Sequence, residues 1–66
     1  MSLWKELLPG YDARIERQDI TGHWVPVGHV QNTGQAVALR LDEVQRFYGG
    51  QRVRAIDSSG TILDIR

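Results

Sequence analysis

The chain has no cysteine, so a domain of only 66 residues is left without disulfides and without thiolate metal ligands. Its two histidines cannot complete a four-ligand structural zinc site by themselves. A chain of this length buries only about 60% of the surface that it exposes when unfolded. Because association with another chain is the remaining common source of stability, we expect either a homodimer or binding to a protein partner.

An excess of charge of one sign is also missing. Eight basic and eight acidic residues balance, and all but one of the basic residues are arginines. A protein dedicated to duplex nucleic acid usually carries a clear basic excess, because neutralising phosphates supplies much of its affinity. No apolar run approaches the roughly 18 residues of a membrane span, and no secretory signal opens the sequence. We therefore expect a single cytoplasmic domain over residues 1–66 that does not enter a membrane.

One short pattern occurs twice in the chain. Residues 14–27 align without a gap on residues 52–65, at a constant offset of 38 positions. Each copy consists of a run of alternating side chains, a D-x-x-G turn and a second run. Aspartate favours the first position of a type I turn, and glycine readily adopts the positive φ that closes such a hairpin. The repeat predicts two β-hairpins with tips at Asp19–Gly22 and Asp57–Gly60, and a positive φ at both glycines.

A helix is expected between the hairpins. Apolar side chains recur there at helical spacing: Val37, Leu41, Val44 and Tyr48. Asn32 is the expected N-cap, with Gln35 as its capping-box partner, and Gly49-Gly50 ends the helix. Leu39 lies off the apolar stripe, and this leaves a strand over residues 36–41 as an alternative.

A second, shorter helix is expected over residues 3–8, capped by Ser2, with Leu3, Trp4, Leu7 and Leu8 on one side. The predicted fold class is therefore α+β with the order αββαββ. Its short N-terminal helix falls within residues 1–10, and a four-stranded, mainly antiparallel sheet carries the long helix on one face. The candidate core comprises Ala13, Ile15, Val25, Val27, Val37, Leu41, Val44, Tyr48, Val53, Ala55, Leu63 and Ile65.

Counting outward from each turn predicts which residues face one another. In the first hairpin the expected pairs are Arg17–Val25, Ile15–Val27 and Ala13–His29. In the second they are Val53–Ile65, Ala55–Leu63, Arg54–Asp64 and Ile56–Ile62. The charges of Arg54 and Asp64 would then help to fix the register. Pro26 cannot donate to a ladder, which indicates that its strand has a free edge.

The strongest candidate for a binding site is the sheet face away from the long helix. It is expected to carry Trp24, Ile56 and Ile62, rimmed by Arg14, Arg52 and Arg54, with Glu16 facing solvent. Either the N-terminal helix covers these apolar side chains, or they form an exposed interaction surface, for which tryptophan and arginine are typical residues. We expect a non-enzymatic protein-interaction module that self-associates through this face or through the edge of the strand over residues 61–66.

Single-stranded nucleic acid is the alternative ligand, because sheets with exposed aromatic residues and arginines can stack bases. This face, however, offers only Trp24 as a stacking aromatic. No catalytic residues, metal ligands or cofactor are expected. His23 and His29 are predicted at opposite ends of one strand, and no serine or threonine lies beside a clear base and its orienting group.

Overall fold

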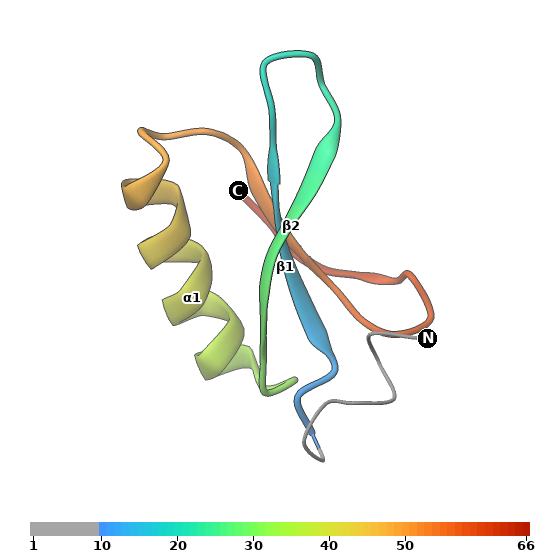
Figure 1. Ribbon diagram of the computed structural model, residues 1–66. Helices are drawn as coiled ribbons and strands as arrows, with labels where there is room; N and C mark the ends of the chain where they lie inside the picture. Colours follow the sequence, from blue (N-terminus) through green and yellow to red (C-terminus); the bar gives the residue numbers. More distant parts are fainter. Residues whose placement is uncertain (1–9) are drawn as a thin grey trace.

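A computed structural model describes residues 10–66 and contains one helix and one sheet in this part of the chain. The elements are β1 (Ala13–Gln18), β2 (Trp24–Val30), α1 (Gly34–Phe47), β3 (Val53–Ile56) and β4 (Ile62–Ile65). The strand order is β2-β1-β3-β4, with every neighbouring pair antiparallel, and α1 packs across one face (Figure 1). The α+β class and the hairpin–helix–hairpin order are thus confirmed. The helix expected over residues 3–8 lies outside the described residues.

The two hairpin tips have the same backbone geometry. The Asp19 N–H donates to the carbonyl oxygen of His23 at 2.8 Å, and the Gly22 N–H donates back to Asp19 at 3.0 Å. The second bond recurs between Gly60 and Asp57, also at 3.0 Å. The φ angles of Gly22 and Gly60 are +92° and +88°, a region that a Cβ atom would strain. The predicted turns and glycine conformations are confirmed.

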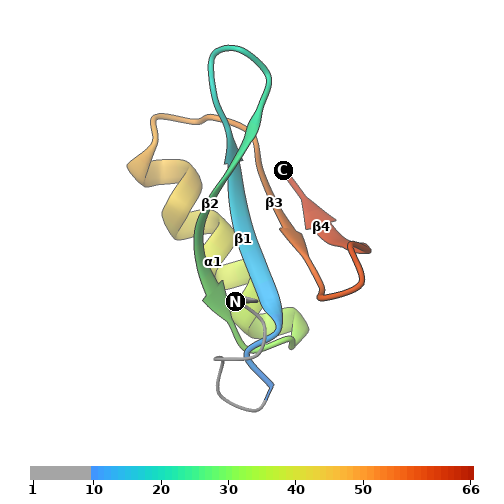
Figure 2. The same ribbon diagram turned by 45° about the vertical axis from the view of Figure 1, so that its right-hand side comes forward.

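An approximate two-fold axis relates the hairpins. Glu16 and Arg54 occupy equivalent positions in the sequence repeat, and the ladder between β1 and β3 pairs them directly with each other. A two-fold axis perpendicular to the sheet must therefore pass between these two residues. Their hairpins accordingly point to opposite ends of the sheet, as Figure 2 shows.

The register of the first hairpin differs from the prediction away from the turn. Arg17 pairs with Val25 as expected, but Ile15 pairs with Gly28 and Ala13 with Val30. The predicted partners Val27 and His29 are each wrong by one residue, because Val27 is an additional residue in β2. It directly follows Pro26, which has no N–H for a ladder, and the strand bulges there.

The register of the second hairpin also differs from the prediction. Arg54 pairs with Ile65 and Ala55 with Asp64, while Ile56 pairs with Ile62 as predicted. Leu63 is the additional residue in β4. The expected pairs Val53–Ile65, Ala55–Leu63 and Arg54–Asp64 are therefore wrong. The bulge also moves Ile65 to the sheet face opposite α1.

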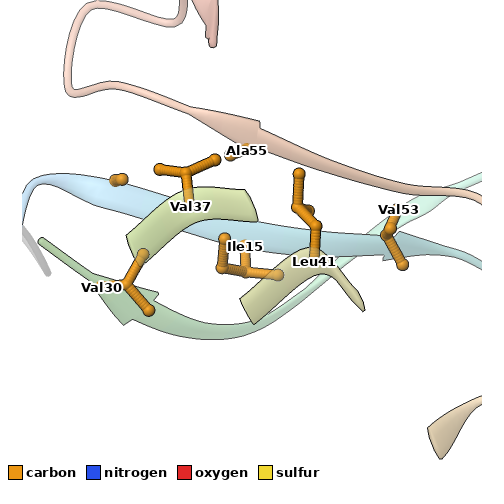
Figure 3. Close-up of a cluster of buried hydrophobic side chains, with 7 residues drawn as sticks. Ile15, Val30, Val37, Leu41, Val53 and Ala55 are labelled. Atoms are coloured by element: carbon orange, nitrogen blue, oxygen red, sulfur yellow. The ribbon is translucent and has the colours of Figure 1, made fainter. Parts of the chain in front are cut away.

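The hydrophobic core lies between α1 and the two central strands. Figure 3 shows Val37 and Leu41 of α1 over Ile15 of β1 and Ala55 of β3. The buried cluster comprises Ala13, Ile15, Val30, Val37, Leu41, Val53 and Ala55, with Val27, Ala36 and Val44 packed against it. Six of these seven buried residues are predicted core residues, and Val30 was missed. Leu63 and Ile65 were wrongly placed in the core, because both are exposed.

The helix begins one residue later than its predicted cap implies. The N-cap is Thr33, whose Oγ1 accepts a hydrogen bond from the Ala36 N–H at 3.2 Å, so the expected Asn32–Gln35 capping box is wrong. The helix continues to Phe47, and the strand alternative over residues 36–41 is excluded. Leu39, which lies off the predicted stripe, is 58% exposed and does not belong to the core.

Candidate functional site

The sheet face away from α1, called the outer face below, holds every residue of the predicted site. Strand pairing arranges it in three rows from β2 toward β4: Trp24, Gln18 and Arg52; Pro26, Glu16, Arg54 and Ile65; His29, Arg14, Ile56 and Ile62. The alternation of side chains along each strand brings these residues to one side. The structure thus assembles the predicted residues, and their individual surroundings decide which of them can meet a partner.

A buried ion cluster occupies the centre of the outer face. The Glu16 side chain accepts from Arg54 Nε at 2.7 Å through Oε1 and pairs with Arg14 Nη2 at 3.2 Å through Oε2. Glu16 is only 3% exposed, so the expectation that it faces solvent is wrong. A buried carboxylate needs partners of opposite charge, and two guanidinium groups supply them here. Both arginines are therefore committed within the fold rather than free for a ligand.

Arg54 also covers the indole ring of Trp24. Its guanidinium carbon lies 4.3 Å from the ring centroid, in cation–π geometry, and Trp24 is half-buried. Arg54 therefore bridges the carboxylate of Glu16 and the ring of Trp24. One face of the Trp24 ring is thus already occupied, which leaves less of it for a stacked base.

The exposed apolar area gathers at one edge of the sheet, on β4. Ile62 is 51% exposed, Ile65 41% and Leu63 36%, whereas Ile56 beside them is buried. Among the described residues β4 pairs only with β3, so its other edge has no neighbouring strand. The sequence correctly placed Ile62 on the outer face but assigned Leu63 and Ile65 to the core, because it gave no sign of the bulge in β4.

An arrangement that resembles a catalytic group lies at the first hairpin tip. Thr21 Oγ1 is 2.6 Å from Asp19 Oδ1 and 2.7 Å from His23 Nδ1. An ionised carboxylate only accepts hydrogen bonds, so the hydroxyl donates to Asp19 and His23 must donate to the hydroxyl. A histidine that carries its proton on this nitrogen cannot remove the threonine proton, so the group is a turn and not an activated nucleophile.

The same turn chemistry recurs at the second tip, where Ser59 Oγ donates to Asp57 Oδ1 at 2.7 Å. The hydroxyl hydrogen bonds, followed by backbone N–H groups, hold the pKa of Asp19 and of Asp57 below the ordinary value. Such a duplicated geometry indicates a structural role for both tips.

His29 lies near the far end of β2 from His23, and burial together with the charge of Arg14 lowers the pKa of its imidazole. No group of three or more metal-ligating side chains occurs within residues 10–66. No helix in the same range is long and apolar enough to cross a membrane.

The chain matches no protein-family model, no curated protein and no solved structure. Its function must therefore be inferred from the geometry of its own surfaces.

Proposed function

We propose that the chain is a non-enzymatic protein-interaction module that self-associates through the free edge of β4. The observation that carries this proposal is the coincidence of an unpaired strand edge with exposed apolar side chains on the same strand. Sheet edges offer backbone N–H and C=O groups to a second strand, and apolar residues there add burial to the hydrogen bonds.

A second copy of the chain can pair with this edge once the Ile65 N–H, which donates to Asp64 Oδ1 at 2.8 Å, turns to the new strand. If two β4 strands pair antiparallel about a two-fold axis between Leu63 and Asp64, Ile62 faces Ile65 of the other copy twice. Both side chains belong to the outer face because of the β4 bulge. Four isoleucines would then form one apolar cluster across the dimer, next to the buried Ile56 of each copy. This like-with-like pairing is what a two-fold interface requires.

The opposite edge of the sheet is less suited to a second strand. Both edge strands contain a bulge, but β2 also contains Pro26, which cannot donate a hydrogen bond to a further strand. The sheet therefore has one obstructed edge and one open edge. Self-association through a sheet edge is expected at β4 for that reason.

The nucleic-acid alternative finds less support on this surface. Arg14 and Arg54 are paired with Glu16, and Arg54 covers the ring of Trp24. Arg52 alone among the three predicted arginines is exposed. A stacking platform needs open aromatic faces and unpaired cations, which this arrangement provides only in part.

Sedimentation velocity over a range of concentrations tests the proposal. We compare the wild type with the double variant Ile62→Lys/Ile65→Lys and with the control Ile20→Lys. Ile20 is 100% exposed at the first hairpin tip, so the control makes the same chemical change away from β4. The β4 variant should lose an association step that the control keeps.

Equal behaviour of the three proteins would contradict the proposal. Titration of a labelled single-stranded oligonucleotide at low and moderate salt addresses the alternative. Binding that collapses as salt rises would favour a nucleic-acid ligand.

A further inference from the structure

A second surface with exposed apolar side chains runs along α1 on the side toward β2. We call it the α1 stripe; its members are Ala36, Leu39, Arg40, Glu43, Val44 and Phe47. Their spacing of three and four residues places them on one side of a helix. Phe47 is 81% exposed and Leu39 58% exposed, which is unusual for large apolar residues in so small a domain.

The α1 stripe is hollowed at both ends. A hollow of about 250 Å³ lies beside the small side chain of Ala36 and is bounded by Val30 of β2. A second hollow of about 220 Å³ lies beside Val44 and Phe47. Arg40 and Glu43 border both hollows and so lie between them. One end of the α1 stripe thus has a small residue and space, while the other has a large projecting ring.

The middle of the α1 stripe carries two opposite charges without partners. Within residues 10–66, neither Arg40 nor Glu43 takes part in an ion pair or a side-chain hydrogen bond. By contrast, Asp42 on the adjacent side of the helix is paired with Arg66. A cation and an anion about one turn apart are therefore both available to a partner.

These features are self-complementary. Positions 36 and 47, like positions 40 and 43, lie symmetrically about the midpoint between residues 41 and 42. A two-fold axis at this midpoint would pack α1 antiparallel against α1 of a second copy. Phe47 would then face Ala36 of the second copy. Within one helix, residues 36 and 47 are about 16 Å apart along the axis, so the two Phe47–Ala36 contacts lie at opposite ends of the interface. Arg40 would face Glu43 of the second copy, and each contact would occur twice.

We propose that the α1 stripe is a second self-association surface, in which Phe47 of each copy enters the hollow beside Ala36 of the other. The α1 stripe lies toward β2, and β4 forms the opposite edge of the sheet, so one molecule can use both surfaces at once. Two different two-fold contacts on one chain link copies into a closed tetramer or an open array. This inference does not depend on the β4 contact.

Four proteins separate the two contacts by sedimentation velocity: the wild type, Ile62→Lys/Ile65→Lys, Phe47→Lys, and the variant with all three changes. The wild type should exceed a dimer, each single-surface variant should stop at a dimer, and the combined variant should be a monomer. Removing an aromatic side chain that fills a pocket on the partner typically raises the dissociation constant about 30-fold. Ile20→Lys is again the matched control, and circular dichroism verifies that each variant is folded.

The pattern of masses distinguishes the two ways of failing. If Ile62→Lys/Ile65→Lys is a monomer at every concentration, the α1 contact is overturned. If Phe47→Lys is a monomer while Ile62→Lys/Ile65→Lys still dimerises, the β4 contact is overturned and the α1 contact stands. A wild type that is monomeric throughout overturns both.

A charge exchange tests the pairing itself, in the background of Ile62→Lys/Ile65→Lys. Arg40→Glu alone and Glu43→Arg alone each place like charges opposite one another across the two-fold axis and should abolish the dimer. The two changes together restore opposite charges and should restore the dimer. A purely structural effect on α1 would not be reversed in this way. A combined variant that associates as weakly as the single ones would overturn the proposed pairing.

Discussion

The position of Glu16 and Arg54 on the pseudo-two-fold axis leads to a prediction about exchanging them. In the wild type, Glu16 is held by Arg54 across the ladder and by Arg14 two residues earlier on its own strand. Arg52 stands two residues before position 54, as the repeat equivalent of Arg14. A carboxylate introduced at position 54 would therefore meet one arginine across the ladder and Arg52 on its own strand. The double variant Glu16→Arg/Arg54→Glu should rebuild the same ion cluster with the two strands exchanged: Glu at position 54 between Arg at position 16 and Arg52.

The single variants should be far less stable than the double variant. Glu16→Arg places a third guanidinium beside Arg14 and Arg54 in a site that is only 3% exposed. Leaving buried charge uncompensated costs about 3–5 kcal/mol. A domain of 66 residues is expected to have only about 3–10 kcal/mol of stability in total. The double variant should lose about 1 kcal/mol, chiefly the cation–π contact between position 54 and Trp24.

Equilibrium urea unfolding of the wild type, both single variants and the double variant gives the coupling free energy between the positions, which we expect to be at least about 2 kcal/mol. Arg52→Gln supplies the control. It should change the unfolding free energy of the wild type by less than about 0.5 kcal/mol, because Arg52 is exposed, and destabilise the double variant more. A double variant no more stable than the weaker single variant would refute the argument from symmetry.

Three further predictions concern the turns and the core. Hydrogen bonds from neighbouring hydroxyls lower the pKa of Asp19 and Asp57 in the folded state. The two carboxylates therefore stabilise the fold above about pH 4, and this contribution is lost as the pH falls through their folded pKa. The double variant Asp19→Asn/Asp57→Asn should for that reason lose less stability than the wild type as the pH falls. Gly60→Ala should cost about 1–2 kcal/mol in urea unfolding, because φ is +88° there although space is open around the residue. Leu41→Ala should cost about 2–5 kcal/mol and Leu39→Ala under about 1 kcal/mol, because the first side chain is fully buried and the second mostly exposed.

The parts of the fold that depend on local signals could be predicted from the sequence. The D-x-x-G turns place both tips correctly because aspartate, hydroxyl residue and glycine satisfy the turn within five residues, with no help from the rest of the chain. The stripe of Val37, Leu41 and Val44 likewise places the helix, since its period is set by the backbone alone.

The register was not predicted, because a bulge adds one residue to one strand and shifts every pair beyond it. Beyond Val27 and Leu63 every predicted pair is therefore one residue out. The same shift explains the main error at the candidate site. The sequence identified the outer face and its arginines, yet it paired Arg54 with Asp64. Its true partner is Glu16, 38 residues away, a contact that depends on which strands are neighbours.

The two copies of the repeat differ at the positions that distinguish the two sheet edges. Equivalent apolar residues in the two copies, such as Ile15 and Val53, face the core, and the identical aspartates and glycines form the turns. These positions maintain the fold. Where one copy has Pro26 in β2, the other has Asp64 in β4. Pro26 removes a donor from the edge of β2, whereas Asp64 keeps its own N–H and accepts the Ile65 N–H through Oδ1 at 2.8 Å. A duplicated hairpin would by itself give a sheet with two equivalent open edges, which favours uncontrolled growth. Divergence at this position weakens the edge of β2 as a partner for a further strand, which favours the edge of β4 in the proposed self-association.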